Sequence, residues 1–413
     1  MNVLAPLKLS PAGRFTPLDG YRAFACLMVV VVHAAEGTGF VDAHPVMDPN
    51  FIGYFAVVIL FTMSGFLVYK PFVDRHLSSR PAPSTGRFLW QRLLRIYPLY
   101  WVVVTVYFLS RDPGEIDVPG LWGWIRVYGL FQIYDLDTYG RGILVAWTLA
   151  VDVSFYLAVP LLALAARTAA KRFGTSMRAR LSGELLVTLL FFSIGPFWRT
   201  YWITDGRTRL VDIWLPSQTE FFGLGMALAV TFSWVSHGGQ LPRALRWLAD
   251  HPVVCYVLAA ELFWVLGQAD LPRSSLNPLD AFRLGLSDQT IRYLVYTGAA
   301  LLVFVPAVFG RATALSNRLL GSRPLRVMSE LSYGVYLWHV FFLLRAVDWL
   351  GGKDVAGFLP TLYIGLVLAL VASLVTYLTV ERPTARLRNI GLPTLPKSPG
   401  PRARTTTTAR PTT

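Results

Sequence analysis

The sequence has little charge and almost no cysteine for its length. Asp, Glu, Lys and Arg make up 15% of its 413 residues, whereas soluble domains are closer to one quarter charged. The two cysteines, Cys26 and Cys255, lie in predicted helices and imply no disulfide framework. With these cysteines and only scattered histidines, the sequence also predicts no metal cluster. We therefore expect neither an ordinary soluble domain nor a disulfide-stabilised secreted one.

Long apolar runs take the place of the missing charge. Hydrophobic residues make up 54% of the chain, and a helix of roughly 20 apolar residues can span a bilayer. The candidate spans, some of them shorter than this, are Tyr21–Ala35, Phe51–Tyr69, Ile96–Leu109, Leu144–Ala166, Leu185–Ile203, Thr219–Val235, Val253–Gly267, Ile291–Phe309, Tyr333–Leu350 and Phe358–Val380. We therefore predict an all-α, polytopic protein of about ten transmembrane helices in the lipid bilayer of the plasma (inner) membrane.

The charged residues that are present are unevenly placed. The net charge is +14, which on its own would suit a nucleic-acid-binding protein. When the predicted helices alternate from a cytoplasmic N-terminus, most of the basic residues fall in cytoplasmic segments and most of the acidic residues fall outside. Basic residues concentrate on the untranslocated side of membrane proteins. The positive balance therefore predicts that both termini are cytoplasmic, and it does not predict a nucleic-acid partner.

The chain divides by composition into three parts. Residues 1–17 form a short cytoplasmic lead, and residues 18–390 form one membrane domain, with no soluble catalytic domain expected beside it. Residues 391–413 are rich in Pro, Thr, Ser and Arg, so we expect a disordered cytoplasmic tail. The longest outward segment, Ser110–Gly142, contains aromatic residues between charges and predicts an interfacial helix.

Arg22 and His33 are the most informative ionisable pair, because charged or titratable residues inside a membrane are costly. They are eleven residues apart, which is almost three helical turns and roughly 16 Å along one face. Arg22 lies at the predicted cytoplasmic edge, and His33 lies in the outer half of the bilayer. An anion-binding end and a base, joined by an apolar wall, suit a long substrate with a charged head and a reactive tip. The alternative is a topology anchor and a structural histidine.

Further polar residues lie at or within the neighbouring predicted helices. Arg92 and Arg95, at the start of the third helix, share one face and could bind phosphates bidentately. Their alternative role is positive-inside anchoring, which fits Arg92 better than Arg95. Ser64 and Gly65 lie in the middle of the second helix, where close helix packing is the commoner explanation.

A carboxylate and a second histidine complete the candidate set. Asp152 lies in the outer half of the fourth helix, at a depth comparable with His33, and needs a partner there. A carboxylate commonly orients a catalytic imidazole, so a contact between these two is expected. Arg199 and Glu220, near the outer ends of two helices, could form a structural pair. His339 lies mid-membrane in the ninth helix.

Seven segments are arranged in order along the membrane domain: Leu18–Ala23 continuing to His33, Leu60–Leu67, Arg92–Pro98, Trp147–Tyr156, Glu220–Gly225, Leu331–His339 and Glu381–Pro383. Together they resemble membrane acyltransferase family 3, the group that O-acylates bacterial surface glycans and some secondary metabolites. The first segment matches the family's Arg-x10-His signature. One departure is Asp152, where the family motif usually has Glu, so that the carboxylate is kept on a side chain one methylene shorter.

The resemblance implies acyl-CoA as a cytoplasmic donor co-substrate, with no permanently bound cofactor. Arg22, Arg92 and Arg95 would then bind the nucleotide phosphates, and the pantetheine arm would run beside the first helix. The implied acceptor is a hydroxyl of a cell-envelope glycan, a glycolipid or a glycosylated metabolite. The acyl group is acetyl by family default, and succinyl or a longer chain is also open.

The same resemblance suggests roles at the reacting end. His33 would act as general base on the acceptor hydroxyl, or form an acyl-histidine intermediate. Asp152 would orient the imidazole, and Ser64 or His339 would donate to the developing oxyanion. Two alternatives remain open: a transporter or flippase of an envelope precursor without acyl transfer, and a catalytically inactive scaffold. The absence of an internal repeat weighs against transporter folds built from duplicated halves.

Overall fold

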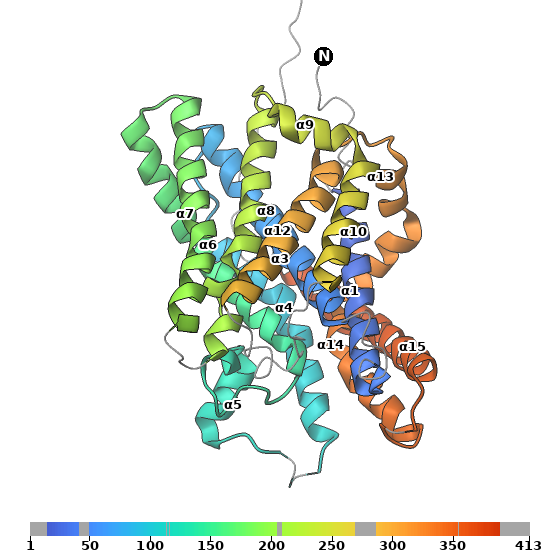
Figure 1. Cartoon of the computed structure of the whole chain (residues 1–413). Coiled ribbons are helices and arrows are strands. Elements are labelled where there is room, and N and C mark those ends of the chain that lie inside the picture. The colour runs from blue at the N-terminus through green and yellow to red at the C-terminus, as the bar shows by residue number, and fades with distance from the viewer. Residues whose placement is uncertain are drawn as a thin grey trace, which may run out of the picture.

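The computed structural model describes residues 15–40, 49–112, 114, 116–204, 209–268, 286–353 and 355–388. Throughout these ranges the regular structure is helical, which confirms the all-α prediction. The long helices run between two ends of one bundle (Figure 1). We call them the α9 end, where α9 (Arg243–Asp250) lies, and the α5 end, where α5 (Gly120–Gly129) lies. The predicted disordered tail and most of the predicted lead lie outside the described residues.

The described helices that are long and apolar enough to cross a membrane number nine, or ten if one bent pair counts as a span. The bent pair is α9 with α10 (Pro252–Gln268), which meet at 94°. The others are α1 (Thr16–Gly37), α3 (Pro49–Leu77), α4 (Thr85–Leu109), α6 (Trp147–Phe173), α7 (Met177–Thr204), α8 (Leu215–Ser236), α12 (Leu286–Phe309), α14 (Arg323–Trp349) and α15 (Phe358–Thr376) with its continuation. The prediction of about ten spans is confirmed.

Shorter elements join or extend these helices. α15 continues through the π-helical turn η5 (Tyr377–Glu381) into α16 (Arg382–Leu387). At the α5 end, η2 (Gln132–Tyr134), η3 (Leu144–Ala146) and η4 (Arg209–Ile213) are short 3-10 turns. A further short helix is α13 (Leu315–Leu320). The segment that predicts an interfacial helix does contain α5, which exposes Leu121 and Trp122.

α1 packs against both α3 and α14, and this central position places its polar residues inside the bundle. The Tyr21 hydroxyl donates to the carbonyl oxygen of Val303 in α12 over 2.8 Å. α4 begins at Thr85, about three turns before the predicted window at Ile96. The arginines between these two residues lower the local hydropathy, but they do not end the helix. Arg92 and Arg95 therefore lie within α4 and not at its start.

Helices α3 and α8 approach so closely that glycine is required in their interface. A Cβ atom at Gly65 would lie 2.2 Å from the carbonyl oxygen of Phe222. A Cβ atom at Gly225 would lie 2.0 Å from the carbonyl oxygen of Thr62. Because both obstacles are backbone atoms, a side chain can be accommodated only by separating the helices. Small residues allow this kind of backbone approach between membrane helices.

We expect Gly225→Ala to destabilise the bundle by about 1–3 kcal/mol, the usual cost of forcing an extra methyl group into a packed core. Gly86→Ala in α4 is the matched control, because a Cβ there meets nothing within 4 Å. Thermal unfolding in nanodiscs should show a lower midpoint for Gly225→Ala and an unchanged or higher one for Gly86→Ala. Equal midpoints for the two variants would contradict the close packing.

Candidate active site

The three arginines predicted to bind phosphates lie in one cavity. This cavity, of about 400 Å³, is formed between α1, α3, α4, α6, α14 and the α15–α16 segment. Arg22, Arg92 and Arg95 line it together with Arg382 and Arg388. We call it the arginine cavity. Asp152, Glu330 and Glu381 line it as well, so five guanidinium groups share the space with three carboxylates and arginines are in excess. Guanidinium groups bind phosphate oxygens bidentately.

Two of these arginines are held in place by neighbouring groups. The Arg22 guanidinium lies 3.8 Å from the Asp19 carboxylate and donates to the Ser329 hydroxyl over 3.4 Å. The Arg92 guanidinium lies 5.7 Å from the ring centroids of Phe88 and Tyr156. Cation–π contacts of this kind fix a guanidinium without neutralising its charge. These contacts therefore orient the donors of Arg22 and Arg92.

Ser64 and Asp152 also line the arginine cavity. The Ser64 hydroxyl donates to Asp152 Oδ1 over 2.9 Å. The expected contact between Asp152 and His33 is not formed, because His33 lines a different cavity. Ile143 and Leu144, just before α6, line that second cavity, whereas Asp152, in the second turn of α6, lines the arginine cavity. The same separation removes Ser64 from the vicinity of His33.

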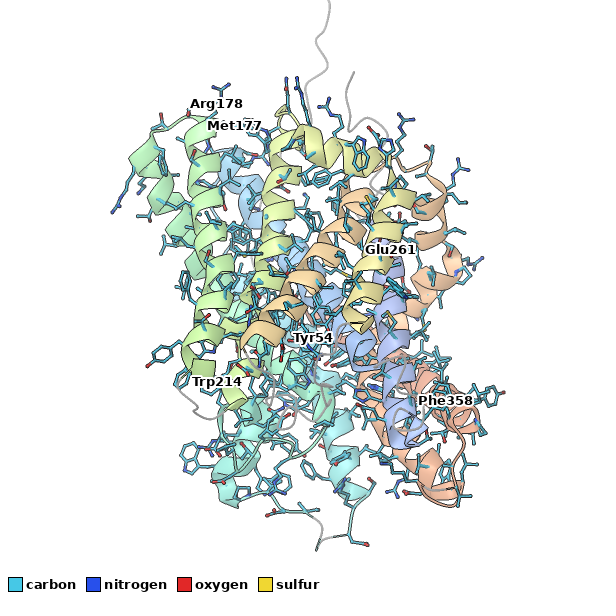
Figure 2. All side chains as sticks on the ribbon, in the orientation of Figure 1. Tyr54, Met177, Arg178, Trp214, Glu261 and Phe358 are labelled. Atoms are coloured by element: carbon cyan, nitrogen blue, oxygen red, sulfur yellow. The ribbon has the colours of Figure 1, made fainter. Side chains whose placement is uncertain are left out.

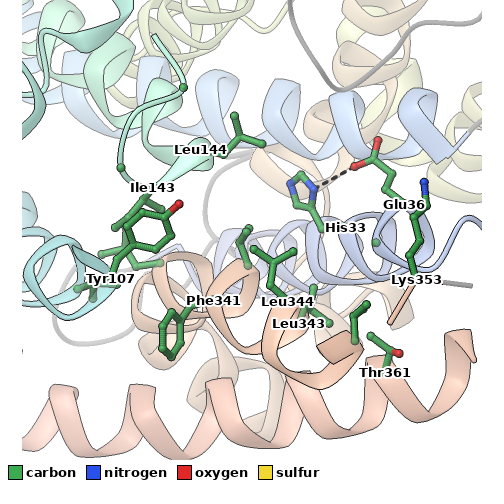
Figure 3. Close-up of a pocket in the computed structure, with 17 residues that line it drawn as sticks. His33, Glu36, Tyr107, Ile143, Leu144, Phe341, Leu343, Leu344, Lys353 and Thr361 are labelled. Carbon is green, nitrogen blue, oxygen red and sulfur yellow. Dashed lines mark hydrogen bonds and ion pairs between the residues drawn. The ribbon is translucent and has the colours of Figure 1, made fainter. Parts of the chain in front are cut away.

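His33 lies in a second cavity of about 570 Å³, shown in Figure 3. We call it the histidine cavity. Its lining comes from the last turns of α1 and α4, the segment before η3, α14 and the start of α15. His33 Nδ1 lies 3.2 Å from Glu36 Oε2, one turn further along α1. Sequence reasoning missed Glu36, although its i+3 spacing from His33 places both side chains on one helix face.

His339 is fully buried beside His33, and the two ring centroids are 5.2 Å apart. Its Nδ1 lies 2.7 Å from the carbonyl oxygen of Tyr336 and 3.2 Å from that of Val335. Carbonyl oxygens only accept hydrogen bonds, so Nδ1 carries the proton of the neutral ring. Nε2 is then an acceptor, and it has no hydrogen-bond partner within the described part of the chain. A neutral His339 in this tautomer cannot donate to an oxyanion through Nε2.

A thin layer of side chains separates the two cavities. Tyr336 and Thr148 line the arginine cavity, whereas the next residue in α14, Leu337, lines the histidine cavity. The Tyr336 hydroxyl lies 2.8 Å from the Thr148 hydroxyl and 3.0 Å from the carbonyl oxygen of Val145. These contacts join α14 to the start of α6. Consecutive residues of α14, Tyr336 and Leu337, thus line different cavities.

Arg199 and Glu220 form the pair that their positions predict. Arg199 Nη2 lies 2.5 Å from Glu220 Oε2, and Nη1 donates to the carbonyl oxygen of Ser217 over 2.7 Å. The guanidinium also lies 3.7 Å from the ring centroid of Tyr293. This part of the bundle, where Tyr54 is labelled in Figure 2, belongs to neither cavity. The pair is therefore part of the packing between helices.

In the described ranges, no group of three or more His, Cys, Asp or Glu side chains is placed to hold a metal ion. Cys26 and Cys255 are both buried free thiols. The polar groups that line the two cavities therefore include the arginines, Ser64 and Asp152 in one and His33 and Glu36 in the other.

Comparisons with known proteins agree on one family. A family model described as an acyltransferase domain matches residues 16–378. Nodulation protein 10 of Rhizobium leguminosarum bv. viciae is 26% identical, over 84% of this chain and 89% of that protein. The O-acetyltransferase OatA of Staphylococcus aureus is 23% identical, over 95% of this chain and 61% of OatA. No solved structure matches the chain.

Proposed function

Because the chain belongs to the acyltransferase family whose domain spans residues 16–378, and is thus a multi-pass membrane O-acyltransferase, we propose that its donor is acyl-CoA and its acceptor a hydroxyl of a glycan, glycolipid or glycosylated metabolite. The family match favours acyl transfer over the transporter alternative. We place the α9 end in the cytoplasm, because basic residues concentrate on the untranslocated side. The name O-acetyltransferase, given to a relative of which this chain covers 61%, supports a hydroxyl acceptor.

The proposal depends on one observation: Arg22 and His33, on the same helix, line two cavities to which the consecutive α14 residues Tyr336 and Leu337 also contribute, one to each. The phosphates of CoA would bind in the arginine cavity. The pantetheine arm is long and uncharged, and it would cross the layer at Tyr336 so that the thioester reaches His33. The roughly 16 Å along α1 between Arg22 and His33 is then the distance between the charged head and the reacting carbon.

At the reacting end, His33 Nδ1–H would donate to Glu36, which leaves Nε2 free as the base. His33 would take the proton of the acceptor hydroxyl as its oxygen attacks the thioester carbon. The new C–O bond replaces the C–S bond, and the proton passes to the CoA sulfur. In this scheme Glu36 takes the orienting role expected of Asp152. Asp152 and Ser64 would instead position the guanidinium groups of Arg92 and Arg95.

Acyl-CoA binding tests the arginine cavity directly. We expect Arg95→Gln and Arg22→Gln each to weaken binding of acetyl-CoA roughly ten- to hundredfold, because a hydrogen bond to a charged group contributes about 1.5–3 kcal/mol. Arg87→Gln is the matched control, since Arg87 lies on α4 but does not line the cavity. The measurement is equilibrium binding of labelled acetyl-CoA to protein in nanodiscs.

The salt dependence of binding gives a second readout. If phosphates bind to the guanidinium groups, binding by the parent protein should weaken as ionic strength rises, because salt screens partly exposed charges. Arg95→Gln should show a shallower dependence. Equal losses for Arg87→Gln and Arg95→Gln would mean that the arginines act only through general surface charge, and the donor site would have to lie elsewhere.

A further inference from the structure

The histidine cavity has a polar end and an apolar recess. In Figure 3, His33, Glu36 and Lys353 lie on one side, and Lys353 is exposed, so this end reaches the surface. Ile143 and Phe341 lie on the opposite side. The apolar recess is the part lined by Val103, Ile143, Leu144, Leu337, Val340, Phe341 and Leu344, to which Tyr107, beside Ile143 in Figure 3, adds an aromatic ring and one hydroxyl. His33 therefore stands between a polar approach and a space that disfavours polar groups.

The histidine cavity as a whole is larger than an acetyl group needs. An acetyl group has three heavy atoms, and at roughly 30 Å³ each, the share of a water molecule in the liquid, they fill about 90 Å³. The whole histidine cavity measures about 570 Å³. A sugar would have to desolvate its hydroxyl groups to enter the recess, which is unfavourable without hydrogen-bond partners. An alkyl chain has no such penalty and gains from burial.

From this arrangement we propose that the transferred group is an apolar acyl chain longer than acetyl, with its alkyl part in the apolar recess. This inference rests on the proposed function. The thioester carbon lies at His33, the chain extends toward Val103 and Phe341, and the acceptor hydroxyl approaches from the polar end. The two substrates thus occupy different ends of one cavity. The reaction is the same as that proposed above: the C–S bond of the thioester breaks and a C–O bond to the acceptor forms.

The first test compares donors of different length with the parent protein in nanodiscs. CoA release is followed with acetyl-, butyryl-, hexanoyl-, octanoyl- and succinyl-CoA. We expect kcat/KM to rise about threefold to fourfold for each methylene that enters the recess, up to its limit. Succinyl-CoA is the matched donor, because it has the length of butyryl-CoA but ends in a carboxylate. It should be used less efficiently than butyryl-CoA.

The second test fills the recess. Val103→Phe should lower the ratio of kcat/KM for hexanoyl- and octanoyl-CoA to that for acetyl-CoA at least tenfold, because the larger side chain fills the space that the longer chains need. Val106→Phe is the control: it lies one turn further along α4, is 36% exposed and does not line the cavity. Val106→Phe should not change the ranking of the donors by kcat/KM. His33-dependent release from acetyl-CoA shows that each variant is folded.

The outcomes separate the two proposals. A parent protein that prefers acetyl-CoA, with no selective effect of Val103→Phe on longer donors, would overturn the recess assignment and leave acyl transfer standing. A preference for succinyl- over butyryl-CoA would also overturn it. No His33-dependent release from any donor would overturn the proposed function itself. We expect the preferred donor to have a shorter acyl chain in Val103→Phe than in the parent protein, and to be the same in Val106→Phe as in the parent protein.

Discussion

His33→Ala is expected to lower the rate of CoA release by a factor of roughly 10²–10⁴, the usual contribution of a general base, while acyl-CoA still binds. Binding should persist because the arginine cavity does not include His33. The measurement has two parts, thiol release over time and equilibrium binding of labelled acyl-CoA, on the same preparation. Water can serve as the acceptor, so the glycan need not be identified first.

His237→Ala is the matched control for that experiment. His237 follows α8, contacts Ser78 and Ser233, and lines neither cavity, so its removal tests a generic loss of imidazole. It should leave release within about twofold of the parent protein. If His33→Ala releases CoA as fast as His237→Ala, then His33 is not the base. If it loses binding as well as release, the two cavities do not act separately.

Glu36→Gln separates positioning from catalysis. The amide keeps the size and one hydrogen-bond acceptor, but it removes the negative charge that stabilises the protonated imidazole of His33. If Glu36 acts through His33, this variant should lower kcat and shift the pH profile of release, with little change in acyl-CoA binding. A purely structural role for Glu36 would lower the amount of folded protein and leave the pH profile of the remainder unchanged.

The helical bundle could be predicted from the sequence because a helix that spans a lipid bilayer needs a long run of apolar residues, and such runs are visible in the sequence. The predicted span Val253–Gly267 matches α10, but hydropathy does not reveal the bend, which lies before this span, between Asp250 and Pro252. The true start of α4 was also missed. Its arginines are unfavourable in lipid but favourable when they line a cavity, and a hydropathy window cannot distinguish these environments.

For the candidate site, the sequence predicts which residues of one helix lie on the same face, but it does not predict which residues of different helices come into contact. The helical repeat predicts Arg22 and His33 along one face of α1 and Arg92 beside Arg95, and the structure places the three arginines in one cavity and His33 in another. Whether Asp152 contacts His33 depends on how α6 packs relative to α1 and α3, and the spacing of residues within one helix does not determine that packing. Hydrogen bonds between helices, such as Ser64 to Asp152, have no signature in sequence spacing.

The Arg199–Glu220 pair leads to the second large expected effect, on stability. Breaking a buried ion pair by removing one partner typically costs about 3–5 kcal/mol, because it leaves an uncompensated charge in a low-dielectric interior. Both side chains are almost fully buried, with exposed fractions of 4% and 7%. Arg199→Met and Glu220→Met should therefore each lower the free energy of unfolding by this amount. Denaturant unfolding in mixed micelles measures it.

The double variant distinguishes the ion pair from simple packing. Arg199→Met combined with Glu220→Met removes both charges, so its loss should be smaller than the sum of the single losses, and smaller than the loss from Arg199→Met alone. Arg126→Met is the exposed control, because Arg126 pairs with Asp135 over 3.0 Å with 39% of its side chain exposed. That pair should contribute about 0–1 kcal/mol. Strictly additive losses at Arg199 and Glu220 would show that each side chain stabilises the bundle through its own packing, and that their charges are not coupled.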